Sequence, residues 1–146
     1  IPVLLGVKKR SDLEAAPYNT WFTANYEAYE TDQDVIRQLK PLLKGITITI
    51  FMGTWCGDSK EQTPHFYKIL DAAGYNEKKL TLITVSRNKT TPEQHEAGRN
   101  IIRVPTIIFY KNGSELNRIV EYPIESLEKD MLAILSGAPY KHAYAN

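Results

Sequence analysis

The chain contains one cysteine, Cys56, among its 146 residues. A lone thiol cannot form an intramolecular disulfide, and it cannot supply a zinc site that needs several cysteines. The length, with 42% hydrophobic residues, suits one domain with enough chain to bury a substantial core. We therefore expect residues 1–146 to form a single domain in which Cys56 acts as a lone thiol.

Charge and hydropathy exclude several classes of function. The 18 basic and 17 acidic side chains give a net charge of +1, so nothing indicates a nucleic-acid partner. No apolar run approaches the roughly 18 residues of a membrane span. The compartment stays open. A single cysteine suits the reducing cytoplasm, whereas a first residue other than Met also suits a mature protein of the bacterial cell envelope, such as the periplasm.

The first 30 residues differ from the rest and form an N-terminal arm. Residues 1–5 are an apolar run that predicts a short edge strand, although Pro2 and Gly6 weaken this prediction. Five aromatic residues then recur at helical spacing: Tyr18, Trp21, Phe22, Tyr26 and Tyr29. Two interpretations remain open for this helix face. The arm either docks onto the core through its aromatic stripe or caps a substrate groove.

Residues 34–136 alternate between helix and strand patterns. Helices are predicted from about residue 32 to Gly45, from 58 to 73, from Pro92 onward, and over 124–135. Strands are predicted over residues 46–51 and 80–85, and in a hairpin of residues 104–110 and 116–120 around Asn112-Gly113. This order predicts an α/β fold with a mixed central sheet and helices on both of its faces.

Cys56 lies in a tight turn between a predicted strand and the start of a predicted helix. Unpaired N–H groups at a helix N-terminus stabilise a thiolate. The negative charge of Asp58 opposes this effect, so we expect a moderately activated thiol. The alternative interpretation of a lone cysteine is an inert, buried side chain.

Three motifs follow one another on the expected elements. Residues 54–60 read Thr-Trp-Cys-Gly-Asp-Ser-Lys, Pro64 comes eight residues after Cys56, and residues 104–106 read Val-Pro-Thr. In this order they resemble the active-site turn of the thioredoxin superfamily, usually Trp-Cys-Gly-Pro-Cys-Lys, its helix-kinking proline and its cis-proline segment. The resemblance covers about residues 34–135 and implies a thioredoxin-like fold.

The resemblance also implies a site. Cys56 corresponds to the nucleophile and Ser59 to the position of the second, resolving cysteine. Pro105 is expected to be cis and close to Cys56, where the backbone of its neighbours receives an extended substrate chain. Substrate contacts are then expected from both segments: Trp55, Gly57, Asp58, Val104, Pro105 and Thr106.

Departures from the superfamily pattern limit the chemistry. Without a resolving cysteine, no internal thiolate can release a mixed disulfide at Cys56. The buried acidic residue and the lysine of the superfamily's proton relay fall on Ile50 and Thr84. Ser59 has two interpretations. Its hydroxyl either donates a hydrogen bond to the Cys56 thiolate, or it simply caps the helix or faces solvent in the first helical turn.

The two histidines that could serve as a base are poorly placed. His65 lies about 13 Å along the predicted helix from Cys56, too far for a hydrogen bond. His95 can approach Cys56 only through tertiary structure. No metal-ligand spacing and no Gly-rich phosphate loop occurs, so we expect no cofactor.

Three functions remain in competition. The first is a monothiol thiol–disulfide oxidoreductase whose Cys56 forms mixed disulfides with a protein or small-molecule thiol. The second is a redox-inactive thioredoxin-fold module that binds a partner chain. The third, suggested by the likeness of Cys-Gly-Asp-Ser to the Cys-Gly-Phe-Ser turn of monothiol glutaredoxins, is a protein that binds glutathione and an iron–sulfur cluster. Trp55, Asp58 and the long arm argue against the third, and the oligomeric state stays open.

Overall fold

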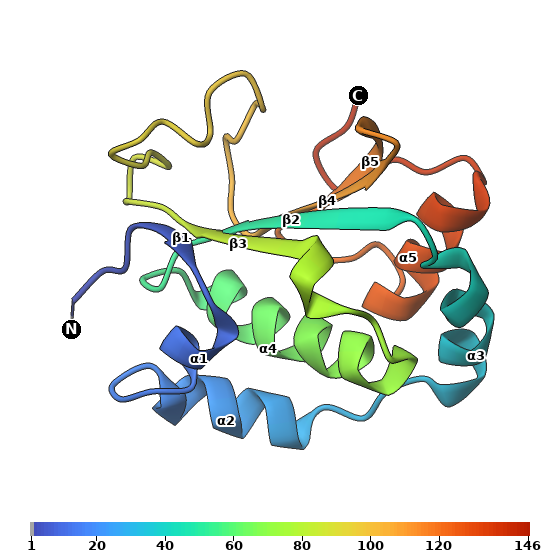
Figure 1. The fold of residues 1–146 in the computed structure, drawn as a ribbon, viewed down its shortest axis with the longest axis horizontal. Helices are drawn as coiled ribbons and strands as arrows, with labels where there is room; N and C mark the ends of the chain where they lie inside the picture. Colours follow the sequence, from blue (N-terminus) through green and yellow to red (C-terminus); the bar gives the residue numbers. More distant parts are fainter. Residues whose placement is uncertain (1) are drawn as a thin grey trace.

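A computed structural model describes residues 2–146 and contains a five-stranded sheet in the order β1-β3-β2-β4-β5 (Figure 1). The central strands β2 and β3 are parallel, and the other neighbouring pairs are antiparallel. The predicted mixed sheet is therefore confirmed. The strands span Gly6–Lys8 (β1), Ile46–Met52 (β2), Leu80–Thr84 (β3), Thr106–Lys111 (β4) and Ser114–Val120 (β5).

Most of the predicted helices are present. The helix predicted at residues 58–73 is α4, and its last turn ends at Gly74 in the left-handed conformation. Asp32 begins α3 by accepting a hydrogen bond from the Val35 N–H. The helices span Arg10–Leu13 (α1), Asn19–Ala28 (α2), Gln33–Leu42 (α3), Gly57–Ala73 (α4) and Leu127–Ser136 (α5), with a short 3₁₀ helix at Glu77–Lys79 (η1).

The two faces of the sheet are covered differently. Alternate residues of β2, such as Ile48 and Ile50, face the cluster formed by α2, α3, α4 and α5. Phe51 points the other way, into a smaller cluster with Val85 and Val104. Figure 1 shows the helices on one side of the sheet and the irregular segment 86–105 (yellow) on the other.

The helix predicted after Pro92 is wrong, and so is the expectation of helices on both faces. The local signal produces a single turn, because Gln94 adopts a left-handed backbone with φ of 58°. The Glu96 carboxylate accepts hydrogen bonds from both the N–H and the hydroxyl of Thr91, which closes the turn into a loop. Gly98 and Asn100 then continue with positive φ, which no α-helix tolerates.

The predicted edge strand also lies elsewhere. The paired residues are those of β1, which runs antiparallel to β3, and not residues 2–5. Ile1 lies outside the described residues. The preceding segment is held by side chains, since Leu4 N–H donates to the Thr54 hydroxyl and the Tyr18 hydroxyl donates to the Pro2 carbonyl.

The aromatic face of α2 packs against α4. Phe22 is buried, and its ring lies 6.0 Å from that of Tyr67. Pro64 inside α4 has no N–H to donate to the Lys60 carbonyl, one turn earlier. Asn25 of α2 fills this gap by donating its side-chain amide to Lys60 O at 3.0 Å. This packing supports the docked interpretation of the arm.

The pairing of β2 with β4 positions the candidate site. Phe51, near the end of β2, lies opposite Thr106, the first residue of β4. The turn that follows β2 therefore meets the segment that precedes β4. Asn112 and Gly113, both with positive φ, form the predicted hairpin turn that joins β4 to its other neighbour, β5.

Candidate functional site

Cys56 is the N-cap residue of α4 and is half-buried. Its thiol lies 3.4 Å from the Val104 carbonyl oxygen, to which it can donate. The Val104–Pro105 peptide bond is cis, as the resemblance implies. The thiol and the cis-proline segment are thus in direct contact at the open end of the helix, where unpaired N–H groups favour a bound anion.

Trp55 forms one wall of the site. Its indole N–H donates to the Val85 carbonyl at 2.9 Å, which fixes the ring against the second core cluster. The cations of Arg87 and Lys89 lie 5.4 and 5.7 Å from the centroid of the ring. A side chain at Gly53 would clash with this indole, since a Cβ there would lie 2.5 Å from Trp55 Cε2.

Ser59 is fully buried, with 0% of its surface exposed. Its hydroxyl accepts a hydrogen bond from the Gly53 N–H at 3.1 Å, so it stabilises the turn that carries Cys56. The interpretation of a solvent-facing Ser59 is therefore wrong. The hydroxyl proton is left free to serve a second acceptor.

A cleft of about 350 Å³ opens beside the thiol. Its lining combines Trp55, Cys56 and Val104 with four residues that sequence reasoning missed: Lys89, Ile102, Arg103 and Glu121. Arg103 directly precedes Val104, so its position in the sequence was a usable signal. Glu121 gives no such signal. It adopts φ of 67°, and its N–H donates to the Pro105 carbonyl at 2.7 Å.

The C-terminal segment orders two of these residues. The Arg103 guanidinium lies 3.9 Å from the centroid of the Tyr144 ring, and the Tyr144 hydroxyl donates to Glu121. One tyrosine thus holds both a cation and an anion of the Cys56 cleft in place. The aromatic residues near the C-terminus carried no sequence signal for this role.

The other predicted site residues divide into two groups. Gly57 is exposed in the first turn of α4, and burial raises the pKa of the Asp58 carboxyl, with Glu121 and Glu61 adding to the effect. Pro105 and Thr106 are buried. The Thr106 hydroxyl donates to the Arg103 carbonyl, so its side chain supports the segment and does not line the cleft.

Neither histidine considered as a base lines the cleft. His65 stacks on Tyr29 with ring centroids 4.2 Å apart, and burial lowers its pKa. His95 lies 3.7 Å from the Glu93 carboxylate. Within residues 2–146, no group of three or more His, Cys, Asp or Glu side chains could hold a metal ion, and no helix could cross a membrane.

The comparisons with known proteins agree with this geometry. A family model described as Thioredoxin matches residues 12–133. The chain belongs to the thioredoxin family. A thioredoxin of Staphylococcus aureus is 31% identical over 85 residues, covering 57% of this chain and 76% of that protein.

Two further comparisons extend the likeness. Thioredoxin H9 of Arabidopsis thaliana is 26% identical over 94 residues, covering 64% of this chain, and the match spans only 63% of that thioredoxin. A crystal structure of a Pseudomonas aeruginosa protein of unknown function superposes with a TM-score of 0.67 at 14% identity, covering 92% of this chain and 94% of that one. This likeness shows that the thioredoxin-family chain shares its fold with that protein.

Proposed function

We propose that this member of the thioredoxin family is a monothiol thiol–disulfide exchange protein that forms mixed disulfides through Cys56. The observation that carries the proposal is the contact between the thiol and the Val104 carbonyl, next to the cis Pro105 and at the mouth of a cleft. This arrangement supports binding of an extended substrate chain beside the sulfur.

The proposed exchange takes two intermolecular steps. The Cys56 thiolate attacks one sulfur of a disulfide, so that a new S–S bond forms and the other sulfur leaves as a thiolate, which takes a proton from water. An external thiolate then attacks the mixed disulfide and releases the Cys56 thiolate. The second step must be external because Cys56 is the chain's one cysteine.

The interior beneath the thiol supports slow or partner-dependent release. Ile50 and Thr84, at the positions of the superfamily's proton relay, are both fully buried. The Thr84 hydroxyl donates to the Gly6 carbonyl and is not available to a substrate. No carboxylate or amine therefore lies at these two positions to move a proton.

Exchange with a small disulfide tests the proposal. Native protein is mixed at pH 7 with bis(2-hydroxyethyl) disulfide, and the mixed disulfide is followed by mass spectrometry. The same chain unfolded in guanidinium provides a matched control, because it presents the same cysteine without the site. We expect faster exchange in the native state, release by added 2-mercaptoethanol, and no adduct in Cys56→Ser. A native rate at or below the unfolded rate would contradict the proposal.

A redox-inactive binding module is the second candidate, and one observation favours it. Ile102 lines the Cys56 cleft and is 68% exposed, so an apolar surface is available to a partner chain. Under this alternative, Cys56→Ser retains a partner captured from cell extract. Under the exchange proposal, capture requires Cys56 and is reversed by reductant.

Replacing Ser59 by cysteine tests the missing second thiol. Residues 56 and 59 are three apart at the start of α4, the spacing that the superfamily uses for its disulfide. We expect Ser59→Cys to form an internal disulfide and to gain insulin-reducing activity with dithiothreitol, though less than a complete thioredoxin. Equal activity of the unmodified chain would show that the absence of a second cysteine does not limit turnover.

A further inference from the structure

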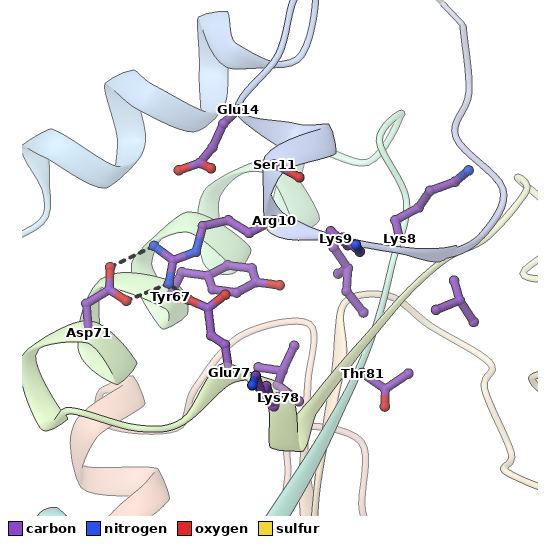
Figure 2. A pocket seen from close by; sticks show the side chains of 13 residues that line it. Lys8, Lys9, Arg10, Ser11, Glu14, Tyr67, Asp71, Glu77, Lys78 and Thr81 are labelled. Carbon is purple, nitrogen blue, oxygen red and sulfur yellow. Dashed lines mark hydrogen bonds and ion pairs between the residues drawn. The ribbon is translucent and has the colours of Figure 1, made fainter.

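A second cavity, of about 830 Å³, lies where β1 leaves the sheet (Figure 2). The pairing of β1 with β3 ends at Lys8 and Leu82, after which the chain turns into α1. Leu80 and Thr81, the first residues of β3, therefore line the cavity together with residues of α1, α4 and η1. No residue of the Cys56 cleft contributes to this lining.

Tyr67 of α4 presents an unused donor to this cavity. Its side chain as a whole is 1% exposed, and its hydroxyl is bonded to no other protein group in residues 2–146. The fully buried side-chain atoms without a partner are Arg10 Nε, whose residue also lines this cavity, and Thr63 Oγ1. Figure 2 shows the hydroxyl end of Tyr67 pointing away from Asp71 and into the space beside Lys9. A hydroxyl that faces a cavity and has no protein partner is available to donate to water or to a ligand acceptor. Burial raises the pKa of Tyr67, which keeps the hydroxyl protonated and able to donate.

The cavity lining contains four basic and three acidic side chains and so carries a net charge of +1. Arg10 lies 4.6 Å from the Tyr67 ring centroid and is paired with the carboxylates of Asp71 and Glu77. One guanidinium offsets only one of these two carboxylates, so the three side chains together carry a net charge of −1. The remaining charged side chains of the lining are Lys8, Lys9 and Lys78 against the single carboxylate of Glu14.

The rest of the lining is apolar. Val7, Leu80 and Leu82 come from the two strands at this edge of the sheet. A ligand that fits must therefore combine an apolar body with an anionic group that accepts hydrogen bonds. Both features occur together in an organic carboxylate.

We propose that this cavity binds a small organic carboxylate. Its carboxylate accepts hydrogen bonds from the Tyr67 hydroxyl and from the amine of Lys9 or Lys78, and its apolar body lies on Leu80 and Leu82. Cys56 begins α4 and Tyr67 follows 11 residues later, about 16 Å along the helix. The proposal is therefore independent of the exchange chemistry.

Three probes with the same apolar body test the charge requirement. The full chain is titrated with 4-phenylbutyrate, 4-phenylbutylamine and 4-phenylbutanol, and backbone amide shifts are followed by NMR. We expect saturable shifts at Ser11, Tyr67 and Thr81 for the carboxylate, and at least tenfold weaker binding of the amine and the alcohol. Absence of saturation by the carboxylate, or equal binding of all three probes, would overturn the proposal.

Matched variants test the named donors. Tyr67→Phe should weaken 4-phenylbutyrate binding about tenfold and leave Tm unchanged, because its hydroxyl has no protein partner to lose. Lys78→Gln should weaken 4-phenylbutyrate binding about threefold. Lys111→Gln, at the exposed end of β4, should leave this binding unchanged. Unchanged affinity in Tyr67→Phe, or a lower Tm, would contradict the role given to the hydroxyl. The rate of disulfide exchange at Cys56 should be the same in all three variants.

Discussion

Gly53 shows how a residue without a side chain shapes the Cys56 turn. Its missing Cβ makes room for the Trp55 indole, whose N–H is bound to the Val85 carbonyl. Its own N–H is bound to the hydroxyl of the buried Ser59. The glycine is required by this close approach and not by a positive φ, which a sequence pattern does not reveal.

We therefore expect Gly53→Ala to displace Trp55 and to destabilise the fold by about 1–3 kcal/mol. The measurement is urea unfolding together with tryptophan fluorescence in a Trp21→Phe background, so that Trp55 alone reports. Gly57→Ala is the matched control, because a Cβ at Gly57 meets no atom within 4 Å. Equal effects of the two substitutions would contradict this account of Gly53.

At the scale of helices and strands, Pro64 inside α4 is coupled to α2 through a side-chain hydrogen bond. Pro64 leaves the Lys60 carbonyl without its helical partner, and Asn25 supplies the missing donor. Asn25→Ala should cost about 1 kcal/mol in the native sequence. In a Pro64→Ala background the new N–H can reach the same carbonyl, so the loss should largely vanish. Urea unfolding of the four proteins of this double-mutant cycle measures the coupling, and strict additivity would contradict it.

Asp71 joins α4 to both helices of the arm. Burial raises the pKa of its carboxyl, but hydrogen bonds from Arg10 and Tyr26 outweigh that effect and hold the pKa below its usual value. A lowered folded pKa contributes stability that is present above the unfolded value of about 3.9 and is lost as pH falls through the folded value.

Asp71→Asn should therefore destabilise the protein at pH 7, and its deficit should shrink as pH falls below about 4. Chemical denaturation across pH 2–8 measures this convergence. Asp34→Asn is the control, because the Asp34 side chain is 83% exposed and its pair with Arg37 should contribute little at any pH. A deficit that stays constant down to pH 2 would show that Asp71 acts through packing and not through its charge.

For the molecule as a whole, the N-terminal arm contributes directly to the core. Leu13, Tyr18 and Phe22 are each at least 94% buried, and each large apolar side chain so buried contributes roughly 1.5–3 kcal/mol. Deleting residues 1–30 should lower Tm markedly, as measured by differential scanning calorimetry. An unchanged Tm would favour the interpretation of the arm as a cap over a substrate groove.

Sequence patterns predicted the central parts of this fold better than its surroundings. The β-branched run of β2 and the Asn112-Gly113 turn are local signals that the sheet confirms. The Thr91-Pro92 signal is equally local, but side-chain bonds from Thr91 to Glu96 stop it after one turn. A short sequence pattern does not show whether its surroundings let the predicted element form or close it into a loop after one turn.

The residues of the candidate site likewise fall into those that the sequence predicts and those that only the structure reveals. Cys56 and the segment 104–106 followed from motifs, whereas Glu121 and Tyr144 reach the cleft through contacts between distant parts of the chain. Glu121 also needs a left-handed backbone that its residue type does not favour. Such residues become visible only when the sheet register and the C-terminal segment are known.

The segment 86–105 covers one face of the sheet without a helix, and it supplies Lys89, Ile102, Arg103 and Val104 to the Cys56 cleft. Surface segments of this kind tolerate changes in length and sequence better than packed helices do. Under the proposed exchange function, much of the surface that meets a partner would therefore lie outside the helical layer. If the exchange proposal holds, substitutions at exposed residues of 86–103, such as Ile102, should alter the choice of partner while the helical layer stays the same.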